Sequence, residues 1–110
     1  MPTYAAEVRA VDLAIYADML AGEHAALSAR GEQARSRLRE AAIERDARAN
    51  LAAETVAELE TIGVLGGIDE RAARADLRRL TKSLEAVEQL QGWVEARLAA
   101  ERDDGYALSA

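Results

Sequence analysis

Hydrophobic residues recur at helical spacing along most of the chain, and the last third shows the most regular pattern. Between residues 73 and 98 the apolar positions alternate gaps of four and three. This heptad spacing predicts a helix over residues 69–102 that packs on another helix along one seam. Gln91 is the single polar member, and it either fixes the register of the packed helices or lies where the seam opens to water. The predicted seam is Ala73, Leu77, Leu80, Leu84, Val87, Gln91, Val94 and Leu98.

The first 27 residues also repeat at helical spacing, but their large side chains fall on two stripes. The stripes are separated by more than about 100° around the helix axis, so one partner helix cannot cover both. The segment is then either the central helix of a three-helix bundle or a helix that packs on its own chain with one stripe and on a second copy with the other. The outer stripe, which we expect to make the protein contact, is Tyr4, Val8, Val11, Ile15 and Met19, and the second stripe is Leu13, Tyr16, Leu20 and Leu27.

Trp93 lies beside the heptad seam together with Leu90. An exposed tryptophan is uncommon and this residue type is enriched at protein interfaces. We therefore expect Trp93 to form a second contact surface, with a partly exposed edge of the core as the alternative.

The middle of the chain, residues 28–50, keeps a helix-forming composition but has only Leu38 and Ile43 as large apolar residues. Its charged residues predict a solvated face, with a functional arginine patch at Arg35, Arg37 and Arg39 as the alternative. Gly31 decides the architecture. If it caps a helix with positive φ, three helices of comparable length result, and if it lies inside a helix, one helix could run from Tyr4 to Ile62.

Three glycines within five positions interrupt the helical pattern in the stretch TIGVLGGIDE, residues 61–70. Gly63 is placed as the C′ residue of a helix that ends in a Schellman motif. Asp69 is placed as the N-cap of the next helix, with Glu70 in the first turn where the helix dipole favours a negative charge. The stretch therefore predicts a turn, and the apolar residues of that turn are Val64, Leu65 and Ile68.

These elements predict an all-α fold, either an elongated helical bundle or an antiparallel coiled-coil hairpin. It would have two or three long helices and its main turn at residues 63–68. We expect one helical domain over residues 1–104 and a short tail over residues 105–110. Two aspartates and Gly105 follow Arg102, and both are unfavourable within the end of a helix, so the last helix should end at about Arg102.

Composition narrows the class of protein further. Half of the residues are hydrophobic, but aromatic residues make up 4% and cysteine is absent, which suits a reducing compartment. No segment reaches the roughly 20 apolar residues that a membrane-spanning helix needs. The first dozen residues lack the apolar core of a signal peptide. We therefore expect a cytoplasmic protein that binds no membrane.

Few residues of the sequence are suited to catalysis or to metal binding. His24 is the only histidine, and a Ser28–His24 pair on adjacent turns of one helix has no glycine-rich oxyanion loop near it. The spacing of carboxylates and histidine fits no known metal-binding motif. We expect no catalytic residue, no metal site, no cofactor and no enzymatic activity.

The predicted helices have more apolar stripes than partner helices within the chain to cover them. We therefore expect a non-enzymatic protein that acts in protein-protein interaction, as a scaffold or adaptor, and that self-associates through helix packing into a homo-oligomer. The net charge is −6, without the basic face that direct nucleic-acid binding needs. Residues 51–70 contain five acids and no basic residue. An alternative function is therefore an acidic helical inhibitor, or decoy, that binds a basic, nucleic-acid-binding surface of a target protein through an acidic face at Glu54 and Glu58.

Overall fold

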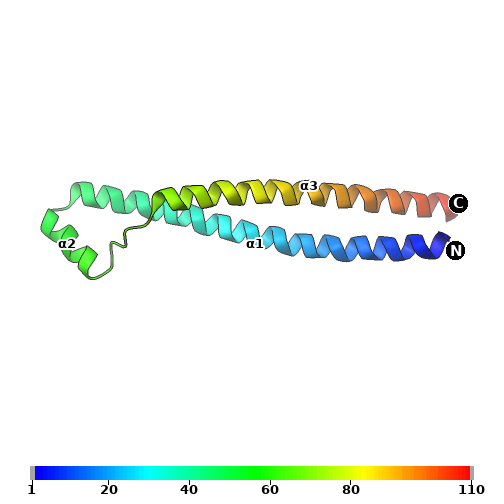
Figure 1. The fold of residues 1–110 in the computed structure, drawn as a ribbon, viewed down its shortest axis with the longest axis horizontal. Helices are drawn as coiled ribbons and strands as arrows, with labels where there is room; N and C mark the ends of the chain where they lie inside the picture. The colour runs from blue at the N-terminus through cyan, green and yellow to red at the C-terminus, as the bar shows by residue number, and fades with distance from the viewer. Residues whose placement is uncertain (1, 110) are drawn as a thin grey trace. The chain divides into compact units, whose positions relative to one another are not determined.

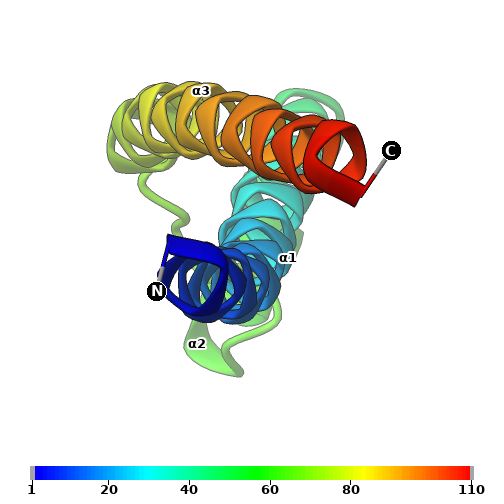
Figure 2. The ribbon, with the colours of Figure 1, turned by 90° about the vertical axis from the view of Figure 1, so that its right-hand side faces the viewer.

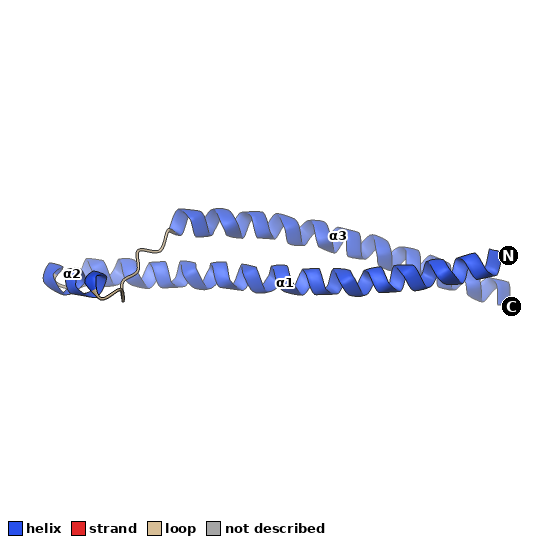
Figure 3. Ribbon diagram, turned by 60° about the horizontal axis from the view of Figure 1, so that its bottom comes forward, coloured by secondary structure: helices blue, strands red, loops and turns tan. Residues whose placement is uncertain are grey.

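The computed structural model describes the backbone of residues 2–109 and the side chains of residues 9–102. Within residues 2–109 the chain forms three helices: α1 (Pro2–Asn50), α2 (Ala53–Thr61) and α3 (Glu70–Ser109). Figure 1 shows their order along the chain, and Figure 3 shows that loops connect helices only, with no strand among residues 2–109. The predicted all-α fold with its main turn before the last helix is confirmed.

The chain divides into two compact units, which are described separately. Unit 1 consists of residues 1–28 and 82–110, and contains the first part of α1 and the last part of α3. Figure 2 shows these two segments in blue and in yellow to red. Arg9 pairs with Glu101 and His24 pairs with Glu88, so the two helices of unit 1 run antiparallel. The most deeply buried of the described side chains of this unit are Leu20 from α1 and Val94 from α3.

Unit 2 consists of residues 29–81 and contains the last part of α1, all of α2, the loop that follows, and the first part of α3. Its core is made largely of small residues, which let helix axes approach closely. The side chain of Leu65 is also buried, so the loop contributes to this core. The buried residues of unit 2 are Gly31, Ala34, Ala41, Leu65, Ala73 and Leu80.

Gly31 lies inside α1 and is buried, and the glycines with positive φ among the described residues are Gly63 and Gly67. The chain therefore does not turn at Gly31. The buried and half-buried positions of α1 continue the spacing of four and three through this glycine, at Leu27, Gly31, Ala34, Leu38 and Ala41. The inner face of α1 is thus a heptad seam built partly of alanine and glycine.

The first helix ends at Asn50, so the possibility that it continues to Ile62 is wrong. Ala52 adopts an extended conformation, with ψ 145°, and α2 begins at the next residue. The amide side chain of Asn50 donates to the carbonyl oxygen of Asp46 over 2.7 Å. The turn brings Nε of Arg48 to 3.4 Å from Oε1 of Glu60, an ion pair that a straight helix could not form.

The predicted helix ends in the turn are confirmed in atomic detail. Gly63 has φ +80°, its N–H donates to the carbonyl oxygen of Glu60, and the N–H of Val64 donates to that of Leu59. This pair of bonds defines a Schellman motif. At the start of α3, the N–H of Ala72 donates to Oδ1 of Asp69 over 3.0 Å, as expected for an N-cap.

The last helix continues to Ser109, so the prediction that it ends at about Arg102 is wrong. A glycine within a helix costs about 1 kcal/mol and an acid near its C-terminus costs a few tenths. Ala107 and Leu108 are strong helix formers, and each further residue adds a backbone hydrogen bond. Unfavourable residues at 103–105 therefore do not suffice to end the helix. The division into a domain over residues 1–104 and a tail over residues 105–110 stays a prediction.

Candidate protein-contact surface

Three residues of the predicted outer stripe are exposed on one face of α1 in unit 1. Val11 is 58% exposed, Ile15 is 64% exposed and Met19 is 52% exposed. They follow one another at a spacing of four residues, which places them one above the other on successive turns. We call these three residues the contact face. Tyr4 and Val8, which the sequence also assigns to the outer stripe, lie outside the described side chains.

The second stripe of the same helix belongs to the inside of unit 1. Leu20 is buried, and Leu13 and Leu27 are half-buried. Tyr16 is the exception, because it remains 39% exposed. The structure therefore separates the two stripes into one that packs within the unit and one that faces solvent.

The seam of α3 lies inward, and Trp93 lies outward. All eight seam residues are buried or half-buried, including Gln91, which is half-buried. Trp93 is 57% exposed, while its neighbour Leu90 is half-buried. This exposure fits both a second contact surface and a partly exposed edge of the core, so both interpretations of Trp93 stay predictions. The seam residues Ala73, Leu77 and Leu80 belong to unit 2, and the other seam residues belong to unit 1 together with Leu90 and Trp93.

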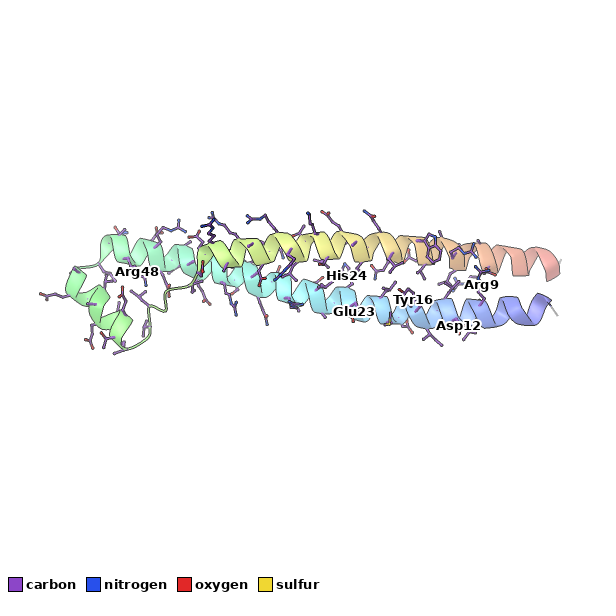
Figure 4. All side chains as sticks on the ribbon, viewed as in Figure 1. Arg9, Asp12, Tyr16, Glu23, His24 and Arg48 are labelled. Atoms are coloured by element: carbon purple, nitrogen blue, oxygen red, sulfur yellow. The ribbon has the colours of Figure 1, made fainter. Side chains whose placement is uncertain are left out.

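Among the described side chains, two polar contacts link the helices of unit 1. Nε of Arg9 lies 3.6 Å from Oε1 of Glu101, and Nε2 of His24 lies 3.1 Å from Oε1 of Glu88. Figure 4 labels Arg9 and His24 along α1. His24 is half-buried, and its contact with Glu88 joins α1 to α3 within unit 1.

Exposed carboxylates surround the contact face. Asp12 and Asp18 lie three residues from Ile15 on either side along the chain, and Glu23 lies four residues after Met19. None of the three has a cation within 4.0 Å among the described side chains. Unit 1 contains ten acidic and four basic residues, and unit 2 contains ten of each. The whole net charge of −6 thus resides in the unit that carries the contact face.

The arginines of unit 2 are held in different ways. Glu70 accepts from Arg45 at 2.6 Å and from Arg74 at 2.7 Å, which joins the two long helices of the unit. Arg35 pairs with Glu32 at 2.8 Å within α1, whereas Arg39 is exposed and makes no ion pair among the described side chains. Arg37 lines a cleft of about 430 Å³ together with Glu40, Ile68, Asp69, Ala72, Ala73 and Asp76.

The acidic face of α2 is open to solvent. Glu54 and Glu58 are both exposed, and the helix has no buried residue. Glu44 of α1 anchors the loop that follows α2, because its Oε1 accepts from the N–H of Gly66 over 3.0 Å. Of the apolar turn residues, Val64 is exposed, but Leu65 is buried and Ile68 half-buried, so the turn offers no exposed apolar cluster of all three.

The sequence pattern did not lead us to predict which residues form the inner face of α1 in unit 2. The small residues Gly31, Ala34 and Ala41 form its inner face in unit 2, whereas Ile43, one of the two large apolar residues there, is 68% exposed. The signal was present, since these positions extend the spacing of Leu20 and Leu27. It was hidden because alanine also occupies many of the exposed positions of the same helix.

No known family model, curated protein or solved structure matches the chain. The side chains of residues 9–102 contain no group of three or more histidines and carboxylates arranged to hold a metal ion. Within the same part of the chain, none of the helices has an apolar stretch long enough to cross a bilayer.

Proposed function

We propose that this chain is a non-enzymatic helical interaction protein, a scaffold or adaptor of the cytoplasm, that self-associates through the contact face of unit 1. The observation that supports the proposal is the exposure of Val11, Ile15 and Met19 on successive turns of one face. Large apolar side chains gathered on one exposed surface are typical of protein-binding sites. A helix that lays its own apolar stripe along this face would remove these side chains from water.

Ile15→Asp tests the proposal. The substitution places a charge at the centre of the contact face, so the assembly should dissociate into monomers. The helices should persist, because Ile15 is 64% exposed and substitutions at exposed sites usually change stability by less than about 0.5 kcal/mol. Light scattering coupled to size exclusion measures the mass, and circular dichroism measures the helicity.

Gln89→Asp is the matched control, because Gln89 is exposed on α3 of the same unit and the substitution introduces the same side chain. It should leave the mass unchanged. A wild-type chain that is monomeric at tens of micromolar would refute self-association. Unfolding of Ile15→Asp would instead show that the stripe belongs to the core of the chain.

A second candidate function is an acidic decoy for a basic surface. It is supported by the exposure of Glu54 and Glu58 on α2 and by the lack of a cation partner for either among the described side chains. Glu54→Gln with Glu58→Gln should then weaken binding to a basic target while leaving self-association intact. Binding to that target that does not change between low and moderate salt would exclude the decoy function.

A further inference from the structure

The charged residues around the contact face are acidic. Between Arg9 and Arg30 the sequence contains three carboxylates and no lysine or arginine. The three are Asp12, Asp18 and Glu23, and all of them are exposed. Figure 4 labels Asp12 and Glu23 along α1. The part of α1 that carries the contact face therefore presents negative charge without basic side chains to offset it.

These carboxylates lie on both sides of the apolar stripe. At about 100° per residue, Asp12 lies about 60° to one side of Ile15 around the axis of α1, and Asp18 lies about 60° to the other side. Glu23 lies on the side of Asp12, about 17 Å further along the axis at a rise of about 1.5 Å per residue. The contact face is therefore an apolar stripe between two acidic edges, and none of the three carboxylates has a cation within 4.0 Å among the described side chains.

This arrangement of charge disfavours several occupants of the contact face. A second copy that presents the same face would bring its own three carboxylates against these, and like charges across an interface are unfavourable. Nucleic acid and an anionic membrane are repelled for the same reason. A helix with an apolar stripe and basic edges instead removes the contact face from water and sets its cations beside the carboxylates.

We propose that the contact face binds a basic amphipathic helix of a partner protein in preference to a second copy of this chain. This inference rests on the proposed role of the contact face in protein binding and names the chemistry of the partner. The spacing of four residues along Val11, Ile15 and Met19 forms a ridge of the kind that packs against another helix. Because the partner and a second copy compete for one face, binding of the partner should dissociate the homo-oligomer.

Two synthetic peptides of about 18 residues, each about 27 Å long as a helix, test the charge of the partner. Both carry leucines along one face, and the edges of that face are lysine in the first peptide and glutamate in the second. Thermophoresis of the fluorescently labelled chain at nanomolar concentration measures their affinities, far below the tens of micromolar at which self-association is measured. The lysine peptide should bind at least about tenfold more tightly, because its charges attract the acidic edges. Equal affinities of the two peptides would overturn the inference.

Substitutions in the chain test where the lysine peptide binds. Asp12→Asn with Asp18→Asn should weaken its binding about threefold to tenfold through the loss of two exposed charges. Ile15→Gln removes an apolar side chain without adding a charge and should weaken binding about tenfold or more. Glu85→Gln with Glu95→Gln is the matched control, because it removes two exposed carboxylates from α3 of the same unit and should change the affinity less than about twofold. If Ile15→Gln binds like the wild type, or if both carboxylate variants weaken binding equally, only net charge attracts the peptide and the inference is wrong.

Sedimentation velocity at tens of micromolar separates this inference from the proposed self-association. The lysine peptide should convert the homo-oligomer into monomers that each carry a peptide. A homo-oligomer that keeps its subunit number with the peptide bound would overturn the inference and leave self-association in place, because the two would then use different surfaces. A wild-type chain that is monomeric without peptide would refute self-association, whereas the measured peptide affinities would still decide the inference.

Discussion

Val94 is completely buried in unit 1, and it is the largest side chain without exposure among the described residues. Val94→Ala removes two methyl groups from this site. At about 0.8 kcal/mol for each buried carbon, the lost transfer free energy is about 1.6 kcal/mol. A cavity that does not collapse adds to the loss, so we expect the free energy of unfolding to fall by about 2 to 3 kcal/mol.

Val64→Ala is the matched control, because it makes the same chemical change at a side chain that is 63% exposed. It should alter the free energy of unfolding by less than about 0.5 kcal/mol. Urea unfolding followed by circular dichroism measures both variants, and an altered midpoint with an unchanged slope reports a change in stability alone. The measurement is repeated at several protein concentrations, because self-association also stabilises the folded chain.

Equal losses in the two variants would refute the reasoning, since burial would then not determine the cost. A loss below about 0.5 kcal/mol for Val94→Ala would show that the two helices of unit 1 do not enclose this side chain in solution. If the dependence of the unfolding free energy on urea changes in Val94→Ala but not in Val64→Ala, the two units unfold separately. The unfolding curve would then be fitted with an intermediate state.

Substitutions at four further positions test α1, the turn and the seam. Gly63→Ala should destabilise the chain by about 1 kcal/mol, because φ is +80° at this residue. Gly22→Ala should instead stabilise the chain by about 0.5 to 1 kcal/mol, because Gly22 lies within α1 and no atom lies within 4 Å of an added Cβ. Thermal unfolding shows whether each substitution lowers or raises the midpoint. Asp69→Ala should cost about 1 kcal/mol through loss of the N-cap bond, and Asp69→Asn should restore most of it in urea unfolding. Gln91→Leu should raise the urea midpoint, because a half-buried polar side chain in a helix seam lowers stability, and a lower midpoint would show that the amide makes a favourable contact.

Local sequence signals predicted the structure correctly where it depends on residues that are close together in the chain. The heptad spacing of α3, the Schellman motif at Gly63 and the N-cap at Asp69 are all properties of short segments, and the structure contains each of them. The sequence also indicated that a single partner helix leaves one of the two stripes of residues 1–27 uncovered, because stripes more than about 100° apart cannot both face it.

The end of α1 could not be predicted in the same way. No glycine or proline stands between residues 32 and 62, and Ala52 is a strong helix former, so local propensity favours continuation to Ile62. The turn at residues 51 and 52 instead allows Arg48 to reach Glu60 and Glu44 to reach Gly66, and the loop buries Leu65. Those contacts involve residues 12 to 22 positions apart, which no local pattern contains.

The sequence by itself determined that the chain is helical, where the main turn lies and which residues form the seam of α3. Only the tertiary structure decided which stripe of α1 faces inward, and it did so by setting Leu20 in the core of unit 1 and leaving Ile15 in solvent. It also decided that Ala34 and Ala41 are buried while Ile43 is exposed. Hydrophobicity alone would place isoleucine inside, but the heptad register of a continuous helix determines which face meets its partner, and Ile43 lies off that face.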